Sequence, residues 1–453
     1  MQTRRARLCW FLLLLAAAAW FTARGPVRAA ADSADLVLIY AAARTWLLGQ
    51  LPYDPAAQQA TMHAINAWPT DPPRELLSLY PPTSFPLLVV PAALPNWPAA
   101  RLLSMGVNTL AAAGLILCAA LWAGLRPGTR GWWLLVIGAL LLAPLHTAVR
   151  MGQTSILCAA LLACGLLLAR GGWRAAGGLL AGLACGLKPQ LAGPVLLLLP
   201  AVRDWRTAAW AAAALLGLLL IGSGWMQLHG HHWPAAFLHN LQQFSQPGGE
   251  ADPGFANPWR HDLVNLAVVL HALPGGSAVA GWAVAALLTA ALAVAATQFA
   301  RAPAAGLCRL AQPAATWALA LLCVISLLAV YHRVYDAVLL VFVLAWWARG
   351  IASGQLSGPR AWAGGALLAL FLLPGPAMLA YLAQAGSIPP ALLHSWIWRA
   401  LLLPHHAWAM AGLLVLLLIS PPRRQPVATS PQAPANPSNR TSSAASGDAP
   451  STP

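Results

Sequence analysis

Long apolar runs, separated by short breaks that carry arginine, repeat through most of this 453-residue chain and constrain its fold more than any other feature. Only 8% of the residues are charged, against about 25% in soluble domains, and the mean hydropathy is +0.66. Runs of this length cross a bilayer as α-helices. The sequence therefore predicts an all-α, polytopic integral membrane protein with about 12 transmembrane helices, within a range of roughly 10–13. After CWFLLLLAAAAWF and the short SFPLLVVPAALP, the predicted spans lie near 99–124, 132–148, 153–169, 175–200, 206–226, 277–299, 314–330, 336–348, 361–383 and 396–419.

The chain opens with a basic flank, MQTRRAR, before its first apolar run. With VRAAA after it, this segment is either a cleavable signal peptide or a retained first transmembrane helix, and the polytopic remainder favours the helix. In both cases the basic start stays cytoplasmic, so residues 28–82 and 227–263 are expected to form large exoplasmic loops. Residues 1–420 then form the membrane domain, and the Pro/Ser/Ala-rich residues 421–453 form a disordered cytoplasmic tail.

Arginine dominates the charge, since the net charge of +15 comes from 25 arginines and one lysine against 11 acids. The arginines stand singly at the ends of apolar runs, which indicates membrane-surface anchoring or attraction to anionic lipid headgroups rather than nucleic-acid binding. Counting spans from a cytoplasmic start places Arg126, Arg130, Arg170 and Arg174 outside, against the positive-inside rule, and Arg150 near the inner face. Either a short segment does not cross, or those arginines have another role.

Metal and nucleotide chemistry gain no support from the sequence. The seven cysteines form no CxxC and lie mostly within apolar runs, where they are small core residues. His229, His231 and His232 have no nearby acid or cysteine that would complete a metal-ligand spacing. No phosphate-binding loop, GxSxG or HExxH motif occurs, so no cofactor and no metal are expected.

Asp35 opens the stretch DLVLIYAAARTWLLGQLPYD, in which a short helix is predicted to end at Gly49. Because Arg44 lies inside this helix, we expect it to rest on the membrane surface rather than to cross. Asp35 is either the N-cap of this helix or a general base for an acceptor hydroxyl. Asp32 is the alternative base. Five of the 11 acids fall between residues 28 and 82, a concentration that solvation alone does not explain.

Lys188 is the only lysine of the chain and lies within the run GGLLAGLACGLKPQLAGPVLLLLP. A cation there usually faces an interior cavity, and Pro189 breaks the helix beside it. Lys188 is therefore either a cation for a lipid-linked phosphate or a residue that extends to the interface from a broken helix.

Two short polar segments join apolar runs and carry further candidates. Residues 150–153 (RMGQ) form either an ordinary turn or a site where Arg150 and Gln153 contact phosphate or sugar hydroxyls. Residues 331–336 (YHRVYD) form either an interfacial aromatic belt or a site where His332, Arg333 and Asp336 bind a phosphate or orient a sugar.

These segments, in this order, resemble glycosyltransferase family 87 of the GT-C superfamily, a group of bacterial polyprenyl-phosphate-mannose-dependent mannosyltransferases. The resemblance rests on short motifs spread over residues 35 to about 345: Asp35 with Tyr40, Ala42, Ala43 and Tyr53-Asp54, YPP at 80–82, GQ at 152–153, LKPQ at 187–190, RDWR at 203–206 and HRVYD at 332–336.

The resemblance implies an inverting transfer of a hexose, mannose first and arabinose or another sugar as alternatives, from a polyprenyl phosphate to a hydroxyl of a glycolipid or cell-envelope glycan. It implies a bacterial inner-membrane enzyme whose active site faces the exterior, with Asp35 as the catalytic base. The predicted substrate-binding residues are Asp32, Tyr40, Arg44, Tyr53, Tyr80, Arg150, Gln153, Lys188, Gln190, His332, Arg333 and Asp336.

Two other classes remain open. A lipid-linked sugar flippase or transporter would also need intramembrane cations, but it should show internal repeat symmetry, and none is evident. A non-catalytic membrane scaffold would require neither the acid-rich first loop nor the buried lysine.

Overall fold

The computed structural model describes residues 4–31, 33–65, 77–273, 281–286, 289–290, 292–293 and 306–422. Most of the predicted span at 277–299, and the predicted tail from residue 423 onward, lie outside the described residues. In the first half of the chain the helices are α1 (Arg4–Arg24), α2 (Pro26–Ala31), α3 (Ala34–Leu47), α4 (Pro55–Ala64), η1 (Pro82–Leu88), α5 (Val89–Ala93), α6 (Trp97–Ala123), α7 (Arg130–Leu141), α8 (Ala143–Met151), α9 (Ser155–Arg170), α10 (Arg174–Leu187), α11 (Pro189–Leu196), α12 (Leu198–Ala201) and α13 (Trp205–Leu228).

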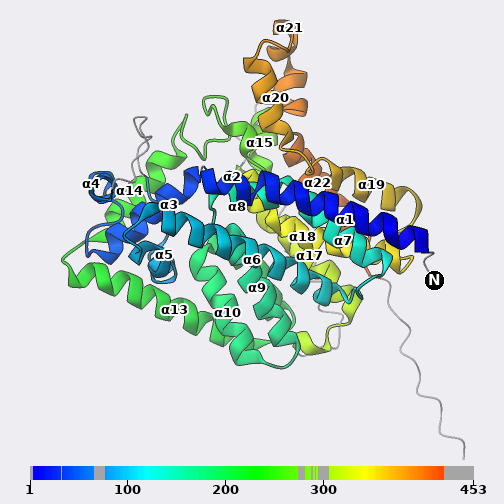
Figure 1. Ribbon diagram of the computed structural model, residues 1–453, viewed down its shortest axis with the longest axis horizontal. Helices are drawn as coiled ribbons and strands as arrows, with labels where there is room; N and C mark the ends of the chain where they lie inside the picture. Colours follow the sequence, from blue (N-terminus) through cyan, green and yellow to red (C-terminus); the bar gives the residue numbers. More distant parts are fainter. Residues whose placement is uncertain are drawn as a thin grey trace, which may run out of the picture. The chain divides into compact units, whose positions relative to one another are not determined.

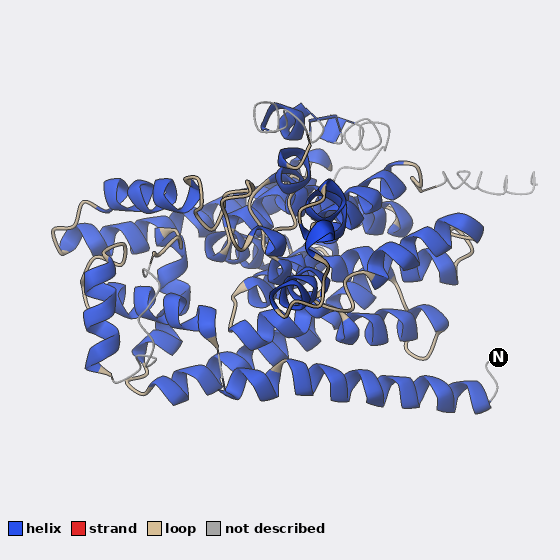
Figure 2. Ribbon diagram, turned by 90° about the horizontal axis from the view of Figure 1, so that it is seen from above, coloured by secondary structure: helices blue, strands red, loops and turns tan. Residues whose placement is uncertain are grey.

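The second half continues the helical pattern (Figures 1 and 2). Its elements are α14 (Trp233–Ser245), η2 (Arg260–Asp262), α15 (Leu266–His271), η3 (Leu307–Arg309), α17 (Gln312–Ala329), η4 (Val334–Leu339), α18 (Leu340–Ala352), α19 (Gly358–Ala369), α20 (Gly375–Gln384), α21 (Pro390–Leu393), η5 (Ile397–Leu402) and α22 (His405–Leu418). The described residues include no strand, only one isolated bridge between Leu263 and Arg333. The all-α prediction is confirmed.

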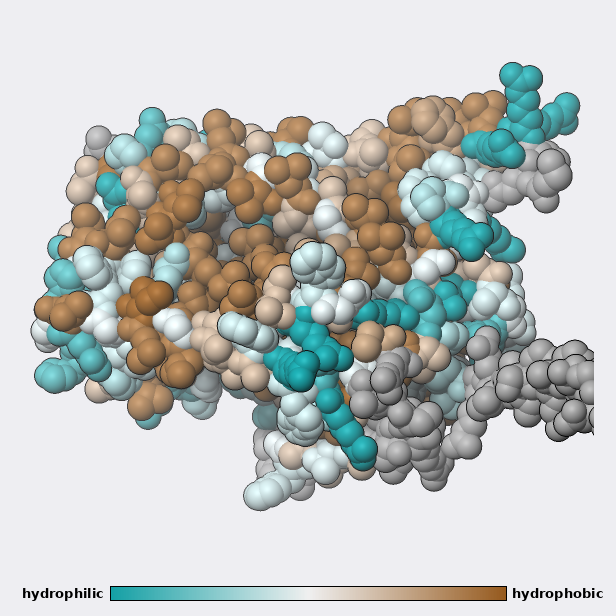
Figure 3. Space-filling view, turned by 90° about the horizontal axis from the view of Figure 1, so that it is seen from below, coloured by the Kyte–Doolittle hydropathy of each residue, from teal (hydrophilic) through white to brown (hydrophobic). Residues whose placement is uncertain are grey.

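Five helical segments of the described chain are long and apolar enough to cross a membrane. They are Arg4–Ala31, Trp97–Ala123, Trp205–Leu228, Gln312–Ala329 and Val334–Ala352, and α7 with α8 adds a sixth span if this pair, bent by 44°, crosses as one. One face of the molecule is largely apolar (Figure 3). The polytopic character is thus supported, while the total of about 12 helices remains a prediction.

Glycine allows α10 to pack closely against two helices at once. A Cβ on Gly177 would lie 2.5 Å from the Gly165 carbonyl oxygen of α9, and one on Gly182 would lie 2.4 Å from the Ala211 carbonyl oxygen of α13. Small residues of this kind let helix backbones approach where apolar burial alone gives little driving force in a membrane. Lys188, the residue that follows α10, is held in place by this packing.

The chain reverses direction at Lys188. Arg174, at the start of α10, lies 3.6 Å from Asp204, just after α12, so α10 and the α11–α12 pair form a hairpin. The predicted single span at 175–200 is therefore wrong. Pro189 explains the reversal, because its ring cannot continue the helix that ends at Leu187.

The turns opposite Lys188 gather at what we call the arginine-rich end. Arg170 donates to the Trp122 carbonyl at 3.3 Å and to Gln312 Oε1 at 3.0 Å, and Arg349 donates to the Ala123 carbonyl. The Gly306 amide donates to the Val202 carbonyl at 2.8 Å. The ends of α6, α9, α12 and α18 and the start of α17 therefore meet here. The N-terminal part of α1 lies at the same end, packed against the start of α7, where the Trp10 and Trp133 rings stack with their centroids 6.4 Å apart (Figure 1).

Residues 82–93 do not cross from one end to the other. The chain emerges at Leu94, whose carbonyl accepts hydrogen bonds from Tyr40 and Arg44 of α3, and α6 begins at Trp97. Because this segment returns to the end where it begins, the turns that carry Arg126, Arg130, Arg170 and Arg174 lie at the same end as the start of α1. This supports the alternative that a short segment does not cross. Arg150 is also corrected, because it lines one cavity together with Arg333, at the end opposite the arginine-rich turns.

Helix α3 is largely buried among other helices, and it is not among the segments long and apolar enough to cross a membrane. Eight of its residues are buried, including Tyr40, Ala41, Ala42, Ala43 and Trp46. The Trp46 indole donates to the Gly222 carbonyl of α13 at 3.0 Å. Arg44, which suggested a surface location, instead satisfies its charge with the carbonyls of Ala92 and Leu94 at 2.9 and 3.0 Å.

Candidate active site

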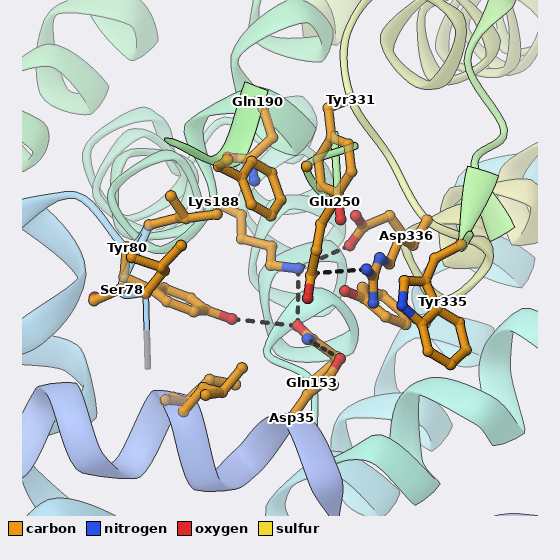
Figure 4. A pocket seen from close by; sticks show the side chains of 18 of the residues that line it. Asp35, Ser78, Tyr80, Gln153, Lys188, Gln190, Glu250, Tyr331, Tyr335 and Asp336 are labelled. Carbon is orange, nitrogen blue, oxygen red and sulfur yellow. Dashed lines mark hydrogen bonds and ion pairs between the residues drawn. The ribbon is translucent and has the colours of Figure 1, made fainter. Parts of the chain in front are cut away.

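A cavity of about 470 Å³ lies at the end opposite the arginine-rich turns, where α3, the 77–81 loop, the 153 turn, the α10–α11 break, the 243–259 loop and the 331–336 segment meet. Figure 4 shows that polar side chains from these separate parts of the sequence converge on it. Its polar lining includes Asp35, Tyr80, Gln153, Lys188, Gln190, Glu250, Tyr331, Arg333, Tyr335 and Asp336.

Asp35 stands in the first turn of α3 and lines this cavity. It is not the N-cap, because that position belongs to Ser33. Its Oδ2 accepts a hydrogen bond of 2.6 Å from Gln153 Nε2. Asp35 thus presents to the cavity a partly exposed carboxylate whose position is fixed by the hydrogen bond from Gln153.

Gln153 is placed beside Asp35 by a tight turn after α8. Gly152 ends α8 with φ +70, and a Cβ there would lie 2.6 Å from the Leu36 Cβ, so α3 packs directly on this turn. The Gln153 amide then donates to Asp35, while its Oε1 accepts from Lys188 at 3.0 Å and from the Tyr80 hydroxyl at 3.2 Å. One buried amide therefore connects the acid, the cation and the phenol.

Lys188 forms a buried ion pair with Asp336, with Nζ 2.8 Å from Oδ1. Nζ also donates to Ser155 Oγ at 2.8 Å and to Gln153 Oε1, so all three ammonium donors are used. Asp336 in addition accepts from Ser155 at 2.5 Å and contacts His332 Nδ1 at 3.2 Å. The lysine charge is thus neutralised within the protein and shared over a network.

Arg333 also lines the cavity, but unlike Lys188 it pairs with a carboxylate that is partly exposed. Its Nη2 lies 2.7 Å from Glu250 Oε2, and the Glu250 side chain is 39% exposed. The buried Arg333 Nε has no hydrogen-bond partner among the described residues. Asn257 holds the Glu250 loop by donating to the Glu250 carbonyl at 3.1 Å and to the Asp252 carbonyl at 2.8 Å. Arg333 therefore offers a guanidinium covered by one carboxylate on a surface loop.

Two tyrosines outside the predicted spans keep their protons at the cavity wall. Burial raises the pKa of Tyr80, and burial also raises the pKa of Tyr331. Each phenol remains a hydrogen-bond donor at neutral pH, suited to a sugar hydroxyl or a phosphate oxygen. Tyr335 completes this aromatic lining, and its ring lies 5.3 Å from the Lys188 ammonium.

The structure brings together eight predicted residues: Asp35, Tyr80, Gln153, Lys188, Gln190, Arg333 and Asp336 line the cavity, and the fully buried His332 contacts Asp336 behind it. Three others support the fold around it. Tyr40 and Arg44 bind the Leu94 carbonyl, and the Tyr53 hydroxyl donates to the Tyr80 carbonyl at 3.0 Å. Arg150 lines a neighbouring cavity instead. Asp32 lies outside the described residues.

Sequence reasoning missed Ser155, Glu250, Tyr331 and Tyr335 as site residues. Ser155 follows the GQ motif by two positions and Tyr331 and Tyr335 lie within YHRVYD, so a wider reading of both segments would have found them. Glu250 gave no signal beyond being an isolated acid in a glycine-rich loop, and only the fold shows that this loop reaches Arg333.

The His cluster of the second loop makes structural contacts. His229 Nδ1 and His231 Nε2 lie 2.9 Å from the carbonyl oxygens of Trp225 and Gly49. Among the residues that the structure describes, no group of three or more His, Cys, Asp or Glu side chains is placed to hold a metal ion.

Comparison with known proteins identifies the family of the chain. Two solved structures of ArnT from Cupriavidus metallidurans, one bound to undecaprenyl phosphate and one in the apo state, align with 19% identity over 91% of this chain and 76% of that protein, with TM-scores of 0.45 and 0.38. No curated protein matches the chain. The profile of glycosyltransferase family 87 matches residues 79–330, more than half of the sequence, and includes Tyr80, Gln153, Lys188 and Glu250. The chain therefore belongs to glycosyltransferase family 87.

Proposed function

We propose that the protein is an inverting glycosyltransferase that moves a hexose, mannose first, from a polyprenyl phosphate to a hydroxyl of a glycolipid or cell-envelope glycan. The observation that carries the proposal is the Asp35 carboxylate, which opens onto a cavity of about 470 Å³ beside two cationic side chains. Membership in a glycosyltransferase family supports the reaction class. A carboxylate next to cations is the arrangement that glycosyl transfer from a lipid phosphate requires.

In the proposed step Asp35 accepts the proton of the acceptor hydroxyl. The acceptor oxygen attacks the anomeric carbon from the face opposite the phosphate and forms the new glycosidic bond. The bond between the anomeric carbon and the phosphate oxygen breaks, and the lipid phosphate leaves with the electron pair. The Gln153 amide, 2.6 Å from Asp35 Oδ2, fixes the base in position.

Arg333 is the stronger candidate for the cation that receives the phosphate. Its carboxylate partner, Glu250, is on a partly exposed loop and can be replaced by a phosphate oxygen, while the unpartnered Nε offers a second donor. All three N–H groups of Lys188 are in use, so it could donate to a phosphate only after its hydrogen bond to Gln153 or Ser155 breaks. Lys188 therefore acts mainly by holding Gln153 and Asp336, and it adds positive potential at the cavity wall.

The donor tail has a natural path into a second, apolar cavity of about 270 Å³. Ile39 lines both cavities, and the lining of the second includes Leu36, Leu88, Val107 and Leu157. Isoprene units are apolar, so their burial there is favourable. A sugar phosphate in the larger cavity and the first isoprenes in the smaller one would lie on either side of Ile39.

We propose the exterior as the side of the active site. The positive-inside rule assigns the arginine-rich end to the cytoplasm, which leaves Asp35 and the 331–336 segment outside. Single cysteines at Gln246 and Ser357, in a variant in which all seven native cysteines are replaced, test this assignment. A membrane-impermeant maleimide added to intact cells should label position 246 and not 357, and the reverse pattern would contradict the proposal.

The decisive test uses the purified protein in lipid nanodiscs with radiolabelled polyprenyl-phosphate mannose and a membrane-glycolipid extract. Transfer of label to an acceptor, with release of the polyprenyl phosphate, is the expected result. In liposomes, movement of the donor between leaflets without any transfer would instead identify a flippase. Comparison of membrane glycolipids with and without the gene would show which glycoform depends on the protein.

A further inference from the structure

A third cavity, of about 190 Å³, lies next to the active site and is not used by the proposed reaction step. It is bounded by the α1–α2 junction, α8, η2, the start of η4 and the Pro374–Ala377 segment. Arg333 and Tyr335 line both this cavity and the larger one. A ligand in it would therefore lie beside the reacting groups without entering the donor's space.

The described lining residues of this cavity bring four guanidinium groups and one carboxylate together. The arginines are Arg24, Arg28, Arg150 and Arg333, and the acid is Asp262. Like charges that line one cavity of this size repel one another. Within the described chain, no carboxylate lies at ion-pair distance from Arg24 or Arg28, and the Arg24 guanidinium stacks at 5.4 Å on the Trp20 ring. Such a cluster favours an anion that offsets the repulsion.

His146 supplies an independent sign of a missing partner. Its ring lines the same cavity, the residue is 2% exposed, and its Nε2 has no hydrogen-bond partner among the described residues. A buried polar nitrogen without a partner is costly and uncommon. An oxygen of a bound ligand, seated among the arginines, would satisfy it.

In the proposed orientation, these arginines lie on the outer side of the membrane. Arg24, Arg28 and Arg150 lie at the active-site end, opposite the arginine-rich turns. Arginine at the outer end of a membrane helix is disfavoured by the positive-inside rule, so the cluster points to a role other than membrane anchoring.

We propose that this cavity binds the phosphate of the acceptor lipid's headgroup, so that the acceptor is an anionic, phosphate-bearing glycolipid. The inference rests on the proposed function, because only a transferase has an acceptor lipid. It places the phosphate of that acceptor beside the donor cavity and not within it. A volume of about 190 Å³ suits a headgroup phosphate with part of one sugar, and a lining with four arginines does not suit an apolar polyprenyl chain. Because Arg333 and Tyr335 line both cavities, the ligand would lie next to the cavity that Asp35 lines.

Binding of dihexanoyl phosphatidylglycerol and dihexanoyl phosphatidylcholine to the detergent-purified full chain, followed by isothermal titration calorimetry, tests the proposal. The wild type should prefer the anionic lipid. The double variant Arg24→Gln/Arg28→Gln should bind it about ten-fold or more weakly, as expected for lost charge-assisted hydrogen bonds. The control Arg101→Gln removes an arginine of α6 that contacts the Ala31 carbonyl and does not line the cavity, and it should bind like wild type.

Three results would overturn the proposal: no preference in the wild type, unchanged binding in the double variant, or inorganic phosphate binding as tightly as the anionic lipid. Binding of undecaprenyl phosphate tests whether the cavity belongs to the donor instead. Its affinity should be the same in the wild type and the double variant, and a parallel loss would assign the cavity to the donor. If the wild type transfers no sugar yet keeps the arginine-dependent lipid preference, the proposed function fails and the anionic-lipid site stands.

Discussion

The Gln153 side chain joins Asp35 to Lys188, residues far apart in the sequence, by donating to the acid at 2.6 Å and accepting from the ammonium at 3.0 Å. The amide therefore has a fixed orientation, because only its nitrogen can face a carboxylate and only its oxygen an ammonium. Both roles are filled at once, so the position of the base depends on the buried ion pair behind it.

Replacing Asp35 by asparagine should abolish transfer and leave the fold intact. Asparagine can still accept the Gln153 hydrogen bond, but it cannot take a proton, so kcat should fall by about 10²–10⁴-fold. The measurement is transfer from radiolabelled polyprenyl-phosphate mannose, with melting temperature as a check on folding. Asp54→Asn is the matched control. Asp54 caps α4 through the Ala56 amide, a role that asparagine also performs, and full activity of Asp35→Asn would remove Asp35 as the base.

Shortening Gln153 should reduce kcat more than it affects donor binding. Gln153→Ala removes the hydrogen bond that positions Asp35 and leaves the Arg333 guanidinium untouched. We expect kcat to fall about ten-fold or more while the donor KM changes less than three-fold, since one positioning bond contributes about 1.5–3 kcal/mol when a partner is charged. Steady-state kinetics at saturating acceptor would measure kcat and the donor KM separately. A rise in donor KM with unchanged kcat would make Gln153 a donor contact instead.

Several parts of this site followed from the sequence because single residues carried them. A lone lysine in an apolar run usually faces an interior cavity, and the polar YHRVYD segment was either an interfacial aromatic belt or a binding site. Lys188 and residues of this segment both line the cavity. The pairing of Lys188 with Asp336 could not be predicted, because it depends on a chain reversal at Pro189. The burial of α3 could not be predicted either. Arg44 indicated a membrane-surface helix, and only the fold shows the carbonyls of Ala92 and Leu94 beside it.

Breaking the Lys188–Asp336 pair should destabilise the protein strongly, whatever its effect on activity. Lys188→Met leaves the Asp336 carboxylate buried and unpaired, which costs about 3–5 kcal/mol. The double variant Lys188→Met/Asp336→Leu removes both charges and should regain most of that stability. Thermal unfolding in detergent measures both. Weaker donor binding in the stable double variant would show that the lysine also attracts the phosphate, while an unchanged donor KM would place the phosphate elsewhere.

Removing the Glu250 charge should tighten the binding of lipid phosphate. Glu250 covers the Arg333 guanidinium at 2.7 Å, so a phosphate must displace it. Because Glu250 is 39% exposed, the pair is worth only about 1 kcal/mol or less, and Glu250→Gln should lower the Kd of undecaprenyl phosphate by about two- to five-fold. Fluorescence titration measures the Kd. Glu250→Asp keeps the charge and is the control, while weaker binding in Glu250→Gln would mean that the carboxylate contacts the donor sugar.

Filling the apolar cavity beside Ile39 should discriminate donors by the length of their tails. Val107 lines this cavity from α6, and Val107→Trp would occupy much of its volume of about 270 Å³. The KM for undecaprenyl-phosphate mannose should then rise, while a donor with only two isoprene units should be used as by the wild type. Leu110→Trp is the matched control, because Leu110 lies on the same helix, is 74% exposed and does not line the cavity. An equal effect of Val107→Trp on both donors would place the tail outside this cavity, since a site that buries isoprene units must distinguish a long chain from a short one.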